Sequence, residues 1–114
     1  MIADSLSQTP LQSFNFANRL VYIKRDDLLH PLFSGNKARK FASLLKQELK
    51  SKTLISYGGN QSNALQSLAS LSLLKDCNLI YFTTPFSKAL LQESEGNFAY
   101  ALKSGVVEFR ETPY

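Results

Sequence analysis

The chain has little of the chemistry on which many enzymes and small extracellular domains depend. It contains one cysteine, one histidine and no tryptophan in 114 residues. A single cysteine, Cys77, excludes an internal disulfide framework and a zinc site built from paired cysteines. A single histidine, His30, excludes an ordinary Ser-His-Asp triad contained in this chain. We expect His30 to be a loop residue and Cys77 to be a small buried apolar group.

Long hydrophobic runs are also missing, and no basic run exceeds three in five residues. No stretch approaches the roughly 20 apolar residues that span a bilayer, and the start of the chain lacks the basic and apolar segments of a signal peptide. The net charge is +4, from 13 basic and 9 acidic side chains. The basic residues are scattered and do not alternate with aromatic ones. The sequence therefore predicts a soluble, cytoplasmic protein that binds neither nucleic acid nor a membrane.

What the chain does contain suffices for one modest domain, since 44% of its residues are hydrophobic and it carries eight phenylalanines and five tyrosines. Residues 1–19 are polar and are expected to be irregular, apart from Thr9-Pro10-Leu11, which is expected to be an extended entry segment. Strands are predicted at 20–23, 53–57, 78–83 and 106–110. Helices are predicted at 37–50, 61–75 and 87–103, the last interrupted near Gly96 and followed by Gly105 as a C-cap. This βαβαβαβ order predicts an α/β fold with an open parallel sheet, in which the apolar strand 78–83 is central.

The first candidate site lies at the start of the first predicted helix, in Ser34–Lys40 (SGNKARK). Asn36 suits an N-cap. Lys37, Arg39 and Lys40 then place three cations where the helix dipole disfavours them, and such a cluster can bind phosphate or carboxylate. Lys37 flanks the apolar stripe of the helix, which favours the neutral amine that forms a Schiff base with an aldehyde. The alternative is the basic first turn of a surface helix.

The second candidate site is the segment Ser56–Asn63 (SYGGNQSN), which joins a predicted strand to a predicted helix. In a parallel sheet this loop lies at the carboxyl end of the strand, where ligands bind. Its amides and short polar side chains could hold a carboxylate, and Ser62 offers a hydroxyl for proton transfer. The loop matches neither a Walker A motif nor a dinucleotide fingerprint. The alternative is an ordinary βα turn with an Asn cap.

Two adjacent acidic residues, Asp26 and Asp27, precede the first candidate site. As strand neighbours they would face opposite ways, so they are a poor general acid/base pair. We expect them to neutralise Lys24, Arg25 or the basic start of the helix.

Taken together, these segments resemble the 1-aminocyclopropane-1-carboxylate deaminase / D-cysteine desulfhydrase family, pyridoxal-phosphate enzymes of the tryptophan-synthase-β type. The resemblance runs in order through nearly the whole chain. The matching motifs are Thr9-Pro10, Ile23–Asp27 (IKRDD), Gly35–Lys40 (GNKARK), Gly58–Asn63 (GGNQSN), and Gly96-Asn97 with Gly105–Val107. The resemblance implies the N-terminal portion of a tryptophan-synthase-β-like fold, with residues 1–51 in the cofactor domain and residues 52–114 beginning the small α/β domain.

The resemblance also implies a role for each candidate residue. Lys37 would carry the internal aldimine of pyridoxal phosphate, and Lys40 would help neutralise the cofactor phosphate. Asn63 would hydrogen-bond the phenolic oxygen of the pyridoxal ring and lie beside the substrate. Gln61 and Ser62 would contact the substrate carboxylate, and Ser62 would take part in proton transfer. The implied activity is deamination or desulfhydration of a small amino acid such as 1-aminocyclopropane-1-carboxylate or one like D-cysteine.

The chain departs from the family pattern in two respects. Ala64–Ser67 (ALQS) stands where the family has His or Gln, any residue, then Arg-Gln, which leaves the exact substrate open. Family members are more than twice as long, and their later residues supply the phosphate cup, the partner of the pyridine nitrogen and tyrosines near the substrate. We therefore expect this chain to be inactive alone, and to self-associate, as in a homodimer, or to be completed by a C-terminal polypeptide. The alternative is a non-catalytic α/β module that binds an anion or a partner chain.

Overall fold

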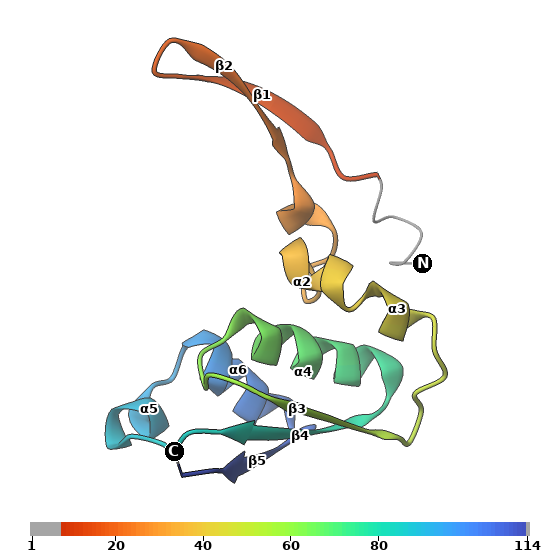
Figure 1. Ribbon diagram of the computed structural model, residues 1–114, viewed down its shortest axis with the longest axis vertical. Helices are drawn as coiled ribbons and strands as arrows, with labels where there is room; N and C mark the ends of the chain where they lie inside the picture. Colours follow the sequence, from red (N-terminus) through yellow and green to blue (C-terminus); the bar gives the residue numbers. More distant parts are fainter. Residues whose placement is uncertain (1–7, 114) are drawn as a thin grey trace. The chain divides into compact units, whose positions relative to one another are not determined.

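The chain divides into two compact units, residues 1–46 (the first unit) and residues 47–114 (the second unit). The computed structural model describes residues 8–113. Figure 1 labels the helices and strands of both units. The domain limits of 1–51 and 52–114 rest on the resemblance alone and stay a prediction.

The first unit begins with an antiparallel hairpin of β1 (Leu11–Phe16) and β2 (Arg19–Lys24). Ala17 and Asn18 form its two-residue turn with φ of 49° and 60°, the left-handed values that a type I′ turn requires. The expectation of irregular structure is therefore wrong for 12–16 and for Arg19, the extended backbone expected at Leu11 is confirmed, and residues 1–7 lie outside the described part of the chain. Polar residues within β1 obscured the strand, because its stabilisation comes from pairing with β2 rather than from an apolar run.

The rest of the first unit consists of short helical segments, namely η1 (Asp26–Leu28), α2 (Gly35–Lys40) and α3 (Ala42–Leu45). The predicted single helix over 37–50 is wrong, because Phe41 interrupts it with φ of −98° and ψ of 10°. The prediction placed Leu49 on the apolar stripe of this helix. Leu49 is instead buried in a turn, where its own carbonyl accepts a hydrogen bond from the Lys52 amide at 2.9 Å. The helical periodicity of this segment thus did not extend the helix beyond Leu45.

The second unit is an α/β fold with a three-stranded parallel sheet in the order β3-β4-β5. Its elements, in chain order, are β3 (Thr53–Tyr57), α4 (Asn63–Lys75), β4 (Asn78–Thr83), α5 (Lys88–Gln92), α6 (Gly96–Ser104) and β5 (Val107–Glu111). The central position of β4, the break before Gly96 and the C-cap at Gly105, with φ of 74°, are confirmed. The first predicted strand is β2, which pairs with β1 in the hairpin and not with the parallel sheet, so a single parallel sheet of βαβαβαβ order is not confirmed.

Helices α4 and α6 pack against each other and cover one face of this sheet, α4 on β4 and α6 on β5 (Figure 1). The covered face buries alternate residues of β4, including Leu79 and Tyr81. Buried serines along α4 allow the close packing expected from its composition. The opposite face is open at β3, where Ile55 and Tyr57 are 71% and 79% exposed. Within the described residues, every helix is too short or too polar to cross a membrane.

Candidate functional site

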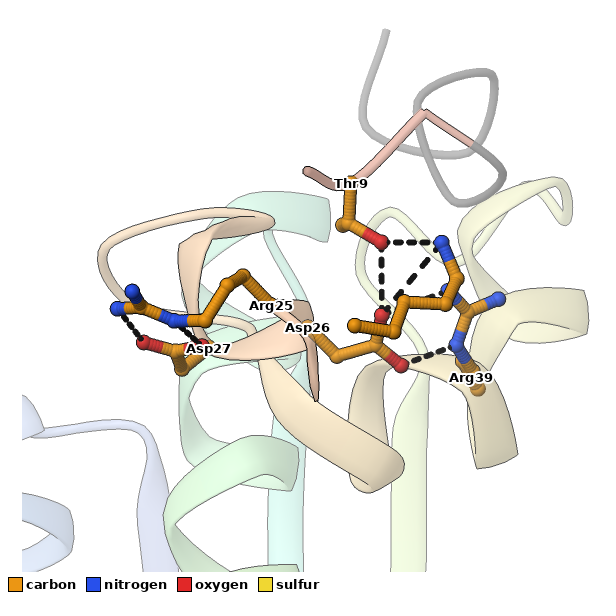
Figure 2. A network of polar contacts seen from close by, with 6 residues as sticks. Thr9, Arg25, Asp26, Asp27 and Arg39 are labelled. Carbon is orange, nitrogen blue, oxygen red and sulfur yellow. Dashed lines mark hydrogen bonds and ion pairs between the residues drawn. The ribbon is translucent and has the colours of Figure 1, made fainter. Parts of the chain in front are cut away.

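Charged side chains of the first unit gather around Asp26, at the start of η1 (Figure 2). Its two carboxylate oxygens accept hydrogen bonds from Arg39 Nε at 2.5 Å and Arg39 Nη2 at 2.9 Å. The Thr9 hydroxyl donates to the same carboxylate at 2.8 Å, and Lys24 Nζ lies 4.0 Å from it. Hydrogen bonds from Arg39 and then Thr9 hold the pKa of Asp26 well below its usual range. This carboxylate therefore stays charged and ties η1 to α2.

The neighbouring carboxylate, Asp27, binds a different cation. Arg25 donates to Asp27 through Nε at 2.8 Å and through Nη2 at 2.7 Å, a bidentate pair that lowers the pKa of Asp27 (Figure 2). The prediction that Asp26 and Asp27 neutralise nearby cations is thus confirmed. The anion site predicted at the start of the helix stays a prediction, and Asp26 already accepts hydrogen bonds from two nitrogens of Arg39 there.

Helix α2 carries the other two predicted cations, Lys37 and Lys40. Lys37 is half-buried, and no hydrogen bond or ion pair to its amine occurs within residues 8–113. Lys40 is exposed, and its Nζ lies 5.6 Å from the centroid of the Phe41 ring. The predicted cap is wrong, since Ser34 is the N-cap residue and Asn36 lies inside α2. Because α2 has only six residues, its dipole adds little to anion binding. Lys37 and Lys40 could therefore attract an anion only through their own amines, with little help from the helix dipole.

The buried side chain of Tyr81 forms hydrogen bonds with the loop between β3 and α4. The Tyr81 hydroxyl donates to the Gly59 carbonyl at 3.0 Å and lies 3.0 Å from Ser62 Oγ. Ser62 is the N-cap of α4, and its Oγ accepts the Leu65 amide at 3.0 Å. A Cβ atom at Gly58, where φ is 155°, would lie 2.5 Å from the Tyr81 hydroxyl oxygen. The glycine therefore leaves the space that this hydroxyl occupies.

The first turn of α6 also forms hydrogen bonds with this loop. Gln61 Oε1 accepts the Phe98 amide at 2.9 Å, so Gln61 caps α6 from another part of the chain. In return, Asn97 Nδ2 donates to the Gln61 carbonyl and to Asn63 Oδ1, each at 3.0 Å. These bonds use the side-chain oxygens of Gln61 and Asn63. Each residue is left with an NH₂ group that can donate to a ligand.

A hollow of about 330 Å³ lies beside this loop, at the carboxyl end of the sheet. It is lined by residues of the loop, of the segment after β4 and of α5: Asn60, Gln61, Pro85, Ser87, Ala89, Leu90 and Glu93. Its location agrees with the general rule that ligands bind beyond the carboxyl ends of parallel strands.

The structure brings three of the predicted site residues together, Gln61, Ser62 and Asn63, at the start of α4 in the second unit. Lys37 and Lys40 lie on α2, in the first unit. Sequence reasoning did not identify Tyr81 or Asn97 as supports of the loop. A signal existed for Tyr81, because a hydroxyl in an apolar, central strand must find a partner when it is buried. For Asn97, pairing with residues 34 and 36 positions away leaves no local signal.

Comparison with known proteins gives partial similarity. No family model matches the chain. A Thermotoga maritima protein named "Putative 1-aminocyclopropane-1-carboxylate deaminase" is 42% identical over 77 residues, which cover 60% of this chain and 24% of that protein. The chain thus spans about a quarter of the length of the curated relative it matches. The similarity agrees with the resemblance to deaminases of this type over part of the chain.

Proposed function

We propose that this chain is the N-terminal part of a pyridoxal-phosphate-dependent deaminase or desulfhydrase acting on a small amino acid. The observation that carries the proposal is the hydrogen bonding of the β3–α4 loop. There, α6 uses the oxygens of Gln61 and Asn63 and leaves their NH₂ groups as donors at the carboxyl end of the sheet. Donors at this place suit a ligand that presents carboxylate and phenolate oxygens. The similarity to the Thermotoga maritima protein supports the same interpretation.

The residues present fit pyridoxal phosphate in two respects. Lys37 has a half-buried amine that no described residue binds, as a covalent attachment to the cofactor aldehyde requires. Asn63 has an NH₂ donor whose orientation Asn97 restricts, as a contact to the phenolic oxygen requires. Lys40, exposed on α2, would neutralise part of the phosphate charge. When bound, pyridoxal phosphate supplies an electron sink for the reacting amino acid.

The chain's own residues would bind and orient the substrate. The Gln61 NH₂ group would donate to the substrate carboxylate, and the Asn63 NH₂ group would lie beside it. Ser62 keeps its oxygen at the α4 N-terminus through the Leu65 amide. We further propose that a second copy or a C-terminal polypeptide completes the site, and that 1-aminocyclopropane-1-carboxylate or an amino acid like D-cysteine is the substrate.

Covalent trapping tests the proposal. The chain is incubated with pyridoxal phosphate, reduced with borohydride and mapped by peptide mass spectrometry. We expect the label to concentrate on Lys37 and to disappear in Lys37→Ala. Lys46→Ala, which removes an exposed lysine of the same unit, is the matched control and should keep the label. Equal labelling of the exposed lysines, or an unchanged label in Lys37→Ala, would reject the assignment.

A second candidate is a non-catalytic α/β module that associates with another chain. The observation that favours it is the open face of the sheet, where Ile55 and Tyr57 project into solvent although parallel sheets are ordinarily covered on both faces. The trapping experiment separates the two candidates, because a module of this kind has no reason to react selectively at Lys37.

A further inference from the structure

The hydroxyl of Tyr81 controls which kind of hydrogen bond Ser62 can make. Tyr81 lies on the central strand β4, is fully buried, and packs edge-on against Phe109 with ring centroids 6.2 Å apart. The hydroxyl oxygen is the only polar heavy atom of the side chain, and it lies next to the β3–α4 loop. Two loop atoms lie within hydrogen-bond distance of it, the Gly59 carbonyl oxygen and Ser62 Oγ, each at 3.0 Å.

Counting protons decides the direction of both bonds. A carbonyl oxygen can only accept, so the single Tyr81 hydroxyl proton goes to Gly59. The bond between Ser62 and Tyr81 must then use the proton of Ser62, with the tyrosine oxygen as acceptor. The chain of donation runs from Ser62 to Tyr81 to the Gly59 carbonyl. It ends there, because an amide carbonyl does not take up the proton.

The Ser62 oxygen itself has two lone pairs, and one accepts the Leu65 amide. With its proton committed to Tyr81, the hydroxyl has one lone pair left for a ligand. We propose that Tyr81 is a positioning residue that makes Ser62 a hydrogen-bond acceptor toward the ligand of this loop. This proposal rests on the proposed function for the ligand being an amino acid. It assigns Ser62 to the substrate's amino group, in place of the carboxylate contact that the resemblance implies, and leaves the carboxylate to the NH₂ donor of Gln61.

The closeness of Gly58 supports this arrangement. Any side chain there would collide with the Tyr81 hydroxyl at 2.5 Å, whereas a Cβ at Gly59 would meet nothing within 4 Å. The loop is thus shaped around the hydroxyl and not only around the aromatic ring.

Nuclear magnetic resonance of the 114-residue chain tests the direction of donation without any ligand. We expect the Ser62 hydroxyl proton to exchange slowly with water and to show a nuclear Overhauser contact to the Tyr81 ring. In Tyr81→Phe, which keeps the ring and removes the hydroxyl, that protection should be lost while the Leu65 amide stays protected. A Ser62 hydroxyl proton that exchanges freely in the wild-type chain would overturn the proposal.

A double-mutant cycle with sodium acetate tests the consequence for binding. Tyr81→Phe releases the Ser62 proton, so acetate affinity, followed by the loop amide shifts, should rise about threefold or more, the gain of one added hydrogen bond. In the Ser62→Ala background, the same Tyr81→Phe substitution should change the acetate affinity by less than twofold. A fall, an equal rise in both backgrounds, or no acetate binding in any variant counts against the proposal.

These tests distinguish a failure of the Tyr81 proposal from a failure of folding and from a failure of the proposed function. If Tyr81→Phe fails to fold by circular dichroism, the exchange measurement on the wild-type chain still decides the direction of donation. If Lys37 is not labelled by pyridoxal phosphate but the cycle behaves as expected, the proposed function fails and the role of Tyr81 stands. Selective labelling of Lys37 with no coupling between Tyr81 and Ser62 would instead support the proposed function and reject the role of Tyr81.

Discussion

The two units of this protein are stabilised by different means. In the described part of the first unit, residues 8–46, the hairpin exposes large apolar side chains on both strands, Phe16 being 67% exposed. The ion pair of Asp26 with Arg39 links η1 to α2, and the ion pair of Asp27 with Arg25 is local. In the second unit, residues 47–113, two helices bury one face of a parallel sheet, and the aromatic rings of Phe86, Phe98 and Phe109 pack against one another in tilted and edge-on pairs.

This difference matters for the candidate residues. Ser62 and Gln61 are oriented by Tyr81 and Phe98, which are buried in an apolar core, and Asn63 is oriented by the neighbouring Asn97. Lys37 lies on a six-residue helix linked to η1 by the charged pair of Asp26 and Arg39. The loop geometry should therefore be insensitive to salt and pH, whereas the environment of α2 should depend on both. Variants of each unit test this contrast.

The largest effect is expected from the aromatic cluster of the second unit. Phe98 is 2% exposed and lies 4.9 Å from Phe86 and 5.0 Å from Phe109 between ring centroids. Phe98→Ala should lower the free energy of unfolding by about 3–5 kcal/mol, because it removes buried area and leaves a cavity. The matched control is Phe16→Ala in the hairpin, which should cost well under about 1 kcal/mol. Urea denaturation measures both; equal losses would mean that the two units do not differ in this way.

A smaller effect is expected at the glycine pair of the β3–α4 loop. Gly58→Ala brings a methyl group against the Tyr81 hydroxyl at 2.5 Å and places alanine at φ of 155°. We expect a cost of about 1–3 kcal/mol from overpacking and backbone strain. Gly59→Ala, with open space around its Cβ, should cost less.

The glycine variants also probe whether the hydroxyl is the source of the collision. In a Tyr81→Phe background the nearest remaining atom to a Cβ at position 58 is the ring carbon at 3.6 Å, which is an ordinary contact. Part of the cost of Gly58→Ala should then disappear in thermal or urea denaturation. An unchanged cost would assign the whole effect to the backbone.

The smallest effect is expected from the charged network of the first unit, and it depends on pH. Because the folded-state pKa of Asp26 is lowered, mainly by Arg39, its contribution to stability is present above the unfolded-state pKa of about 4. That contribution is lost as the pH falls from about 4 toward the folded-state pKa. Asp26→Asn should remove this dependence, followed by the amide shifts of residues 35–40 as the pH is lowered from about 5 to about 2, across the unfolded-state pKa.

Asp27→Asn is the matched control for this titration, because Asp27 pairs only locally with Arg25, two residues away. It should leave the shifts of α2 unchanged, and 1 M salt should weaken the Asp26 effect in the wild-type chain. A transition that persists in Asp26→Asn would place its origin in another group.

Much of the second unit could be predicted from local patterns. The apolar run Asn78–Thr83 identified the central strand, and the glycines at 96 and 105 marked the start and the end of α6. The first unit was harder, because β1 has a weak local signal and is stabilised by β2, whose residues pair with it across the turn. The helix expected over 37–50 is interrupted at Phe41 and ends at Leu45, before the buried Leu49.

The candidate site divides in the same way. Its residue types, the amines of α2 and the polar loop after β3, follow from the sequence, since loop chemistry and strand ends are local features. Their hydrogen-bonding states do not, because each partner lies far along the chain. Arg39 meets Asp26 thirteen residues away, and Ser62 meets Tyr81 nineteen residues away.

The sequence by itself therefore determined the α/β class of the second unit, the position of its strands and the polar loop that follows β3. Short-range periodicity and turn residues encode such features within a few positions. Only the tertiary structure decided that Arg39 is neutralised, that Gln61 caps α6 and that the Ser62 proton is committed to Tyr81. Each of these depends on which donor meets which acceptor across the fold, and that pairing exists only once the chain has closed around its core.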